Sequence, residues 1–178
     1  MATLSTPVVQ LAAVRLPGVS LALLTIMSTC PDGLAGLVLA VDHVGLAVPD
    51  LDAAIAFHTD VLGLELLHRE VNVEQGVSEA MLAPPAGGDD GAQVQLLAPL
   101  TDDSVIARFL QRSRPGLQHL AYRVADVDSA TAVLRRRGLR LLYESARTGT
   151  RGSRINFVHP SDAGGVLVEL VQTARVQP

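Results

Sequence analysis

The sequence predicts an α+β fold in which two βαβββ modules follow one another along the chain. The first observation behind this prediction is an internal repeat: a shift of 76 positions (119 − 43) aligns the segment from Val41 with the segment from Leu117. The second is that both segments carry the same order of strand, capping Asp, helix and terminal Gly. The period is too long for a solenoid, so we expect a duplicated module within one domain.

The first module begins with a strand expected at 43–48. Asp50 is placed to cap a helix at 51–62, and Gly63 is placed to end it. Further apolar-rich strands are expected at 64–68, 78–83 and 93–98.

The second module repeats this order. Its expected elements are a strand at 119–124, the capping residue Asp126, a helix at 127–137, the terminal Gly138, and strands at 139–143, 154–159 and 166–171. The identities that support the repeat include His43/His119, Val48/Val124, Asp50/Asp126, Asp52/Asp128 and, after a one-residue gap, Gly63/Gly138 and Leu64/Leu139.

The expected boundaries are module one at 41–100, a linker helix at 101–113 and module two at 116–174. The core of the linker helix, 101–111, has Thr101 or Asp102 as its candidate cap. Residues 1–40 read as an apolar, poorly ordered extension. Its most apolar stretch, 16–27, is shorter than the roughly 20 residues that span a bilayer. An export signal remains the alternative, although no Ala-x-Ala-like cleavage site follows.

Composition narrows the function classes. The chain has a formal net charge of −4 and a sequence pI of about 5.7, which argues against a nucleic-acid partner. Cys30 is the one cysteine among 178 residues, so no internal disulfide can form. We therefore expect a cytoplasmic protein with neither a nucleic-acid nor a membrane partner.

Four polar residues occupy repeat-equivalent places in apolar strands. His43 and His119 match in the first strand of each module, and Gln95 matches Glu169 in the last strand at an offset of 74 (169 − 95). Two imidazoles, a carboxylate and an amide oxygen suit one divalent cation, with Co²⁺ or Mn²⁺ preferred and Zn²⁺ or Fe²⁺ as alternatives. A lone strand histidine is more often structural, and the repeated pattern is what favours a metal. We expect His58, His68 and His159 to be surface or packing residues.

Several strings together give a family resemblance. They are DHVGLAVPDLDAAIAF (42–57), EQGVSEAML (74–82), QVQLLAPLTDDSVIARFL (93–110), GLQHLAYRV (116–124), GSRINFVHP (152–160) and GGVLVELV (164–171). Over residues 41–172 the chain resembles the vicinal oxygen chelate (glyoxalase/bleomycin resistance/dioxygenase) superfamily, and within it the methylmalonyl-CoA epimerases. One departure is Gln118, where the family often has His. Strand alternation should point residue 118 away from the ligand face.

The resemblance implies a function and its residues. It implies a metal-dependent isomerase that interconverts the epimers of methylmalonyl-CoA in propionyl-CoA metabolism, acting on an acyl-CoA substrate as a homodimer. The implied metal ligands are His43, Gln95, His119 and Glu169, and the implied proton-transfer residues are Glu79 and Glu169. The alternatives are an ethylmalonyl-CoA epimerase, a glyoxalase I-like lyase, a dioxygenase, or a non-catalytic small-molecule-binding protein.

Two further expectations concern the neighbourhood of this site. At offset 76, Glu79 aligns with Ile155, so we expect its carboxyl group on an apolar, buried face, which calls for a functional reason. The alternative is an edge strand whose Glu79 faces water. Arg147, Arg151 and Arg154 could meet the phosphates of coenzyme A or form a solvated loop.

Overall fold

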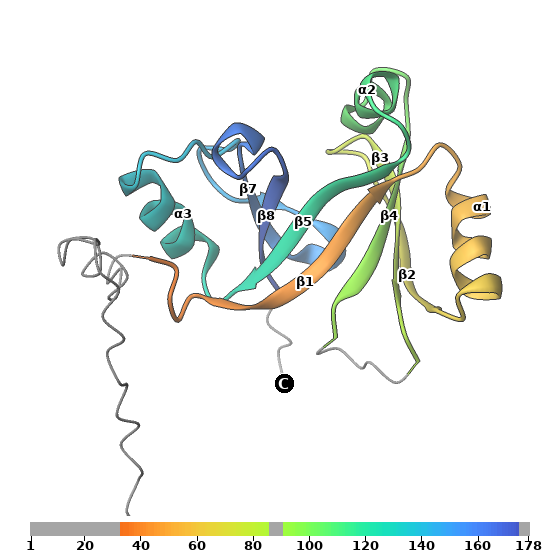
Figure 1. Ribbon diagram of the computed structural model, residues 1–178, viewed down its shortest axis with the longest axis horizontal. Helices are drawn as coiled ribbons and strands as arrows, with labels where there is room; N and C mark the ends of the chain where they lie inside the picture. The colour runs from red at the N-terminus through yellow and green to blue at the C-terminus, as the bar shows by residue number, and fades with distance from the viewer. Residues whose placement is uncertain (1–32, 86–90, 175–178) are drawn as a thin grey trace, which may run out of the picture. The chain divides into compact units, whose positions relative to one another are not determined.

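Eight strands within residues 33–85 and 91–174, the part of the chain that the computed structural model describes, form one mixed β-sheet (Figure 1). The strands are β1 (Val38–Ala47), β2 (Glu65–Asn72), β3 (Val77–Ala83), β4 (Gln93–Pro99), β5 (Gly116–Val124), β6 (Arg147–Thr148), β7 (Arg154–Val158) and β8 (Leu167–Gln172). Their order in the sheet is β2-β3-β4-β1-β5-β8-β7-β6.

The sheet order confirms the duplicated α+β fold. In each half the first strand pairs in parallel with the last strand of its own module, β1 with β4 and β5 with β8. The first strands β1 and β5 pair antiparallel with each other and join the two halves. The helices are α1 (Leu51–Ala56), which continues as a π-helix at Phe57–Val61, α2 (Val105–Arg112) and α3 (Val127–Arg136).

Strand alternation gives the sheet two different faces. Leu82 and Leu96 point towards α1 and form a core with Leu51, while Leu170 packs with Val127 of α3. Since neighbouring residues in a strand point to opposite sides, the odd-numbered residues of β3, β4 and β8 turn away from α1 and α3. The polar residues expected to form the site all lie on this second face.

The predicted ends of the two long helices are confirmed. The Asp50 and Asp126 carboxylates accept hydrogen bonds from the backbone N–H groups of Ala53 and Ser129. Gly63 and Gly138 follow the helices with φ values of 71° and 80°, a region that favours glycine.

The predicted cap of the linker helix is wrong. α2 begins at Val105, and its cap is Ser104, whose hydroxyl accepts from the backbone N–H of Ala107 at 3.1 Å. Thr101 and Asp102 precede the helix, and Thr101 donates to Asp103. Four successive residues of cap-forming type made the sequence ambiguous here.

The strand expected at 139–143 is reduced to an isolated bridge between Leu141 and Val158. The buried side chain of Asn156 explains the interruption. Its Oδ1 accepts from the backbone N–H of Tyr143 and its Nδ2 donates to the Tyr143 carbonyl. Hydrogen bonds to a side-chain amide thus replace the backbone hydrogen bonds between strands at Tyr143.

The start of β1 differs from the expected module boundary at residue 41. β1 begins at Val38, and Leu34 and Leu37 pack against the α3 core. The Leu37 carbonyl also accepts from the N–H of Ala125 at 2.8 Å. Of the predicted extension, residues 1–32 lie outside the described part. Within that part, no helix is long and apolar enough to cross a bilayer.

The far ends of the sheet are linked by side chains. Arg147 of β6 forms an ion pair with Glu74, which follows β2, at 3.2 Å, and Gln75 donates to the Thr148 carbonyl. These contacts join the two ends of the sheet, near β2 and β6, so the sheet curls around its polar face.

Candidate metal and proton-transfer site

The strand register brings the four expected metal ligands into two adjacent rows. Across β4, β1, β5 and β8 the rows read Gln93–His43–Ala121–Glu169 and Gln95–Gly45–His119–Leu167. Each row carries two of the expected ligands, one histidine and one Gln/Glu, with a small residue between them, Ala121 in the first row and Gly45 in the second. These two small residues are themselves repeat-equivalent, so the duplication orders the whole quartet.

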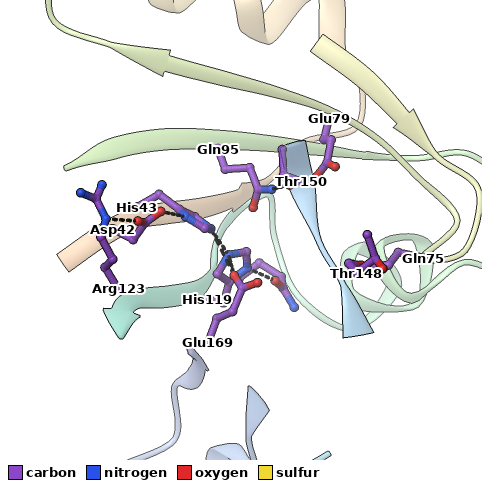
Figure 2. Close-up of polar contacts among 11 residues, drawn as sticks. Asp42, His43, Gln75, Glu79, Gln95, His119, Arg123, Thr148, Thr150 and Glu169 are labelled. Carbon is purple, nitrogen blue, oxygen red and sulfur yellow. Dashed lines mark hydrogen bonds and ion pairs between the residues drawn. The ribbon is translucent and has the colours of Figure 1, made fainter. Parts of the chain in front are cut away.

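His43, His119 and Glu169 converge on one point (Figure 2). Nε2 of His43 lies 2.9 Å from Nε2 of His119, and Glu169 Oε2 lies 3.2 Å and 3.0 Å from these two atoms. Neighbouring ligands of an octahedral ion with bonds of about 2.1 Å are about 3.0 Å apart. All three side chains are buried. The spacing therefore fits one shared divalent cation.

Gln95 lies in the same strand row as His119 and contacts Glu79. Its Nε2 donates to Glu79 Oε2 at 2.7 Å and to the Thr150 hydroxyl at 2.8 Å. Its Oε1 is buried and has no hydrogen-bond partner among the described residues. A buried amide oxygen without a donor is unfavourable unless something else binds it. Gln95 Oε1 therefore suits a cation as its fourth protein ligand.

Each histidine has its own orienting neighbour, a feature that the sequence did not reveal. Asp42 Oδ1 lies 2.9 Å from Nδ1 of His43, and Arg123 donates to the other oxygen of Asp42 at 2.7 Å. The Gln118 amide oxygen lies 2.5 Å from Nδ1 of His119. The Gln118 side chain thus reaches the ligand face that we expected it to avoid. Both contacts leave Nε2 free to face the cation.

Gly45 is a second missed residue. A Cβ atom added there would come within 2.1 Å of the His119 ring. The absent side chain is therefore what lets this imidazole lie over β1. The sequence contained one indication of this role: a glycine stands two positions after the ligand His43, where module two has Ala121.

Glu79 is buried, with 2% of its surface exposed. β3 lies between β2 and β4, so the edge-strand alternative is wrong. Burial and the neighbouring carboxyl group of Glu70 raise the pKa of Glu79 to about 8, against the opposing effect of Thr150. Glu79 is therefore mostly protonated at neutral pH.

The pKa of the Glu169 carboxyl group is shifted in the opposite direction. Burial would raise the pKa of its carboxyl group, but His119 and His43 outweigh burial and hold it well below its usual range. Burial likewise would lower the pKa of His43, yet Asp42 and Glu169 raise it to about 9. His43 and Glu169 therefore form an ion pair, and a cation bound by both side chains would take the place of the proton on His43.

Two cavities open on the cluster. The first, of about 270 Å³, is lined by Glu79, Gln95, His119 and Glu169 together with apolar residues such as Leu97. The second, of about 360 Å³, contains His43 and Glu169. Both candidate proton-transfer carboxyl groups therefore face the first cavity, which has room for a small acyl group.

The three loop arginines lie in different places. Arg147 lines the first cavity and also lies over the Tyr143 ring. Arg151 lines the second cavity. Arg154 forms an ion pair with Asp128 on the helix side. Of the remaining histidines, His58 lies close to a helix carbonyl, whereas His68 contacts Glu70.

Comparison with known proteins supports the resemblance drawn from the motifs. The sequence model of the glyoxalase/bleomycin resistance protein/dioxygenase superfamily matches residues 42–157. The mitochondrial methylmalonyl-CoA epimerase of Bos taurus is 39% identical over 132 residues, which cover 74% of this chain and 73% of the relative. The crystal structure of the Mycobacterium tuberculosis methylmalonyl-CoA epimerase is 55% identical, with a TM-score of 0.74 and coverage of 79% and 91% of the two chains. A methylmalonyl-CoA epimerase in complex with methylmalonyl-CoA and NH4⁺ is 45% identical, with a TM-score of 0.74 and coverage of 79% and 98%.

Proposed function

We propose that this chain, which belongs to the glyoxalase/bleomycin resistance protein/dioxygenase superfamily, is a metal-dependent methylmalonyl-CoA epimerase. The observation that carries the proposal is the convergence of His43, His119 and Glu169 beside a cavity that also holds the buried Glu79. The similarity to epimerases of known structure supports the same reaction and substrate.

His43, His119, Glu169 and Gln95 would hold the cation. A bound divalent ion supplies a Lewis acid that stabilises negative charge on a thioester oxygen beside a carboxylate. The protein's own part is to fix these ligands. Asp42 and Gln118 orient the two imidazoles, and the Gln95 amide group is held by Glu79 and Thr150.

Epimerisation removes the α-proton from one face of a carbon and returns a proton to the other face. Such a reaction needs one base and one acid on opposite sides. Glu169 is ionised and Glu79 is protonated at neutral pH, so the resting pair already has one of each. We infer that Glu169 takes the α-proton of one epimer while Glu79 delivers its proton to the opposite face.

The metal, the coenzyme A contacts, the assembly and the location are finer proposals. We expect Co²⁺ or Mn²⁺, with Zn²⁺ or Fe²⁺ as alternatives, because a donor set of nitrogen and oxygen without thiolate suits all four ions. Arg147 on the cavity wall is the arginine best placed for a substrate phosphate. A homodimer stays a prediction. The cytoplasmic location also stays a prediction, and the mitochondrial name of the Bos taurus relative does not support it.

The test is deuterium wash-in at the α-carbon of methylmalonyl-CoA, with the untreated protein and with a chelator-treated sample. We expect both epimers to exchange and interconvert, and chelator to stop both processes. Ethylmalonyl-CoA serves as the parallel substrate. No exchange with either substrate in the metal-loaded protein would exclude this function and favour the lyase or binding-protein alternatives.

A further inference from the structure

We propose that Glu70 and His68 form a proton route that connects the buried Glu79 carboxyl group with solvent between turnovers. The proposal rests on the proposed function, because it supplies a step that a two-base epimerisation requires. In each turnover one carboxylate gains the α-proton and the other carboxyl group loses its proton to the substrate. Glu79 must therefore regain or release a proton before the same epimer can react again.

Three side chains make a continuous line from the first cavity to the surface of β2. Glu70 of β2 is the cross-strand partner of Glu79 of β3, so the two carboxyl side chains leave neighbouring strands side by side on the same face of the sheet. Glu70 Oε2 lies 2.6 Å from Nε2 of His68, which is two residues earlier on the same strand. Exposure rises along the line, from 2% for Glu79 to 29% for the Glu70 side chain and 33% for the His68 side chain.

The chemistry of the three groups suits proton transfer. A hydrogen bond between two carboxyl groups needs one proton, because carboxylate oxygens only accept. Glu79 Oε1 is buried and no donor within 33–85 or 91–174 reaches it, which agrees with a proton shared between Glu79 and Glu70. An imidazole accepts a proton at one ring nitrogen and releases one from the other, so His68 can exchange with water.

A turn of the second module, residues 150–152, lies beside Glu79. Arg151 in this turn has φ 57° and ψ 28°, a left-handed conformation that non-glycine residues rarely adopt. The preceding residue, Thr150, accepts a hydrogen bond from Gln95, whose amide group also donates to Glu79. This turn therefore holds the Gln95 amide group, and through it Glu79, on the wall of the first cavity.

The test compares the full-length, Co²⁺-loaded protein with its His68→Gln variant over a range of methylmalonyl-CoA concentrations. Proton return takes place in the free enzyme after product release, so it limits kcat and does not enter kcat/KM. We expect kcat of His68→Gln to fall about fivefold or more, with kcat/KM and bound metal unchanged within about twofold. Added imidazole, a small proton carrier, should restore kcat.

Two further variants show at which residue proton transfer along the route is interrupted. Glu70→Gln should show the same loss of kcat, but imidazole should not restore it, because this break lies between the surface and Glu79. Glu65→Gln removes an exposed carboxylate from the same strand and should leave both kinetic constants unchanged.

An unchanged kcat in His68→Gln at saturating substrate would overturn the route. So would an equal fall of kcat and kcat/KM, which is what a purely structural defect produces. If the wild-type protein does not epimerise the substrate at all, the proposed function fails instead, and this is seen before any variant is compared.

Discussion

Glu79 and Glu169 are identical side chains that their neighbours drive to opposite ionisation states. Burial and Glu70 raise the pKa of Glu79 to about 8. Burial of Glu169 is outweighed by His119 and His43, which hold its pKa well below the usual range. At neutral pH the pair carries one proton, and that proton resides on Glu79. The two residues should therefore respond differently to the same substitution.

Glu79→Gln should keep the shape of the site and remove the acid. We expect turnover to fall by a factor of roughly 10² to 10⁴ while bound metal stays near the wild-type amount. Glu169→Gln should lower metal affinity as well, because it removes the one anionic ligand of the quartet. Metal content by elemental analysis and steady-state kinetics distinguish the two effects. Equal epimerisation by Glu79→Gln and the wild-type would exclude Glu79 from proton transfer.

The shared proton also predicts a pH dependence. Both reaction directions need one proton on the pair, on Glu79 for one epimer and on Glu169 for the other. Above about pH 8 Glu79 also ionises, so the pair loses that proton. We expect kcat/KM for both epimers to fall about tenfold per pH unit above that point. A rate that rises steadily from pH 7 to pH 10 would contradict this assignment.

Gly45 offers a substitution that acts on a ligand without touching it chemically. An added methyl group would meet the His119 ring at 2.1 Å, so Gly45→Ala should displace this imidazole. We expect metal affinity to drop by a factor of about 10 to 100, as for other changes that disturb ligand orientation. Gly63→Ala is a control at a glycine with open space around it, although its positive φ costs some stability. Titration with Co²⁺ measures both.

At the scale of elements, the sequence was sufficient to predict the end of a helix where a single capping residue determines it. Asp50, Asp126, Gly63 and Gly138 were read correctly because capping depends on neighbours in sequence. The strand expected at 139–143 failed because Asn156, distant in sequence, takes over the Tyr143 hydrogen bonds. The duplication placed the polar quartet, since equivalent strands repeat their register.

What the sequence could not give were contacts across strands. The Asp42–Arg123 pair and the Glu79–Glu70 pair join residues whose proximity depends on strand register, which only the folded sheet shows. Gln118 was misjudged because alternation fixes where a strand residue's Cβ points, and a long side chain can still reach back to its neighbour.

The start of β1 predicts a difference between two truncations. Deleting residues 1–32 leaves Leu34 and Leu37 on the α3 core, whereas deleting 1–38 removes both and the hydrogen bond to Ala125. We expect the longer deletion to lower the free energy of unfolding by about 1–3 kcal/mol relative to the shorter one. Urea denaturation of both chains measures this. Equal stability would place the start of the folded module at or after residue 39.

At the scale of the whole molecule, the duplication makes one site from two halves. Each module supplies one histidine and one Gln/Glu, so neither half holds a complete ligand set. The residues around the ligands differ between the two modules. His43 is oriented by a carboxylate, Asp42, and His119 by an amide, Gln118. Glu79, on the cavity side, matches the apolar Ile155 of the other module.

This arrangement predicts that metal binding couples the halves and stabilises the fold. EDTA should abolish activity that Co²⁺ or Mn²⁺ restores, and Co²⁺ at about 100 times its dissociation constant should add about 2.7 kcal/mol to the free energy of unfolding. His43→Ala and His119→Ala should each remove most of this gain, because each deletes one ligand from one module. Thermal unfolding with and without Co²⁺ measures the gain independently of activity, with His58→Ala as the control histidine. If only one of the two ligand variants lost the stabilisation, the cation would be held by one module, and the duplicated site would be wrong.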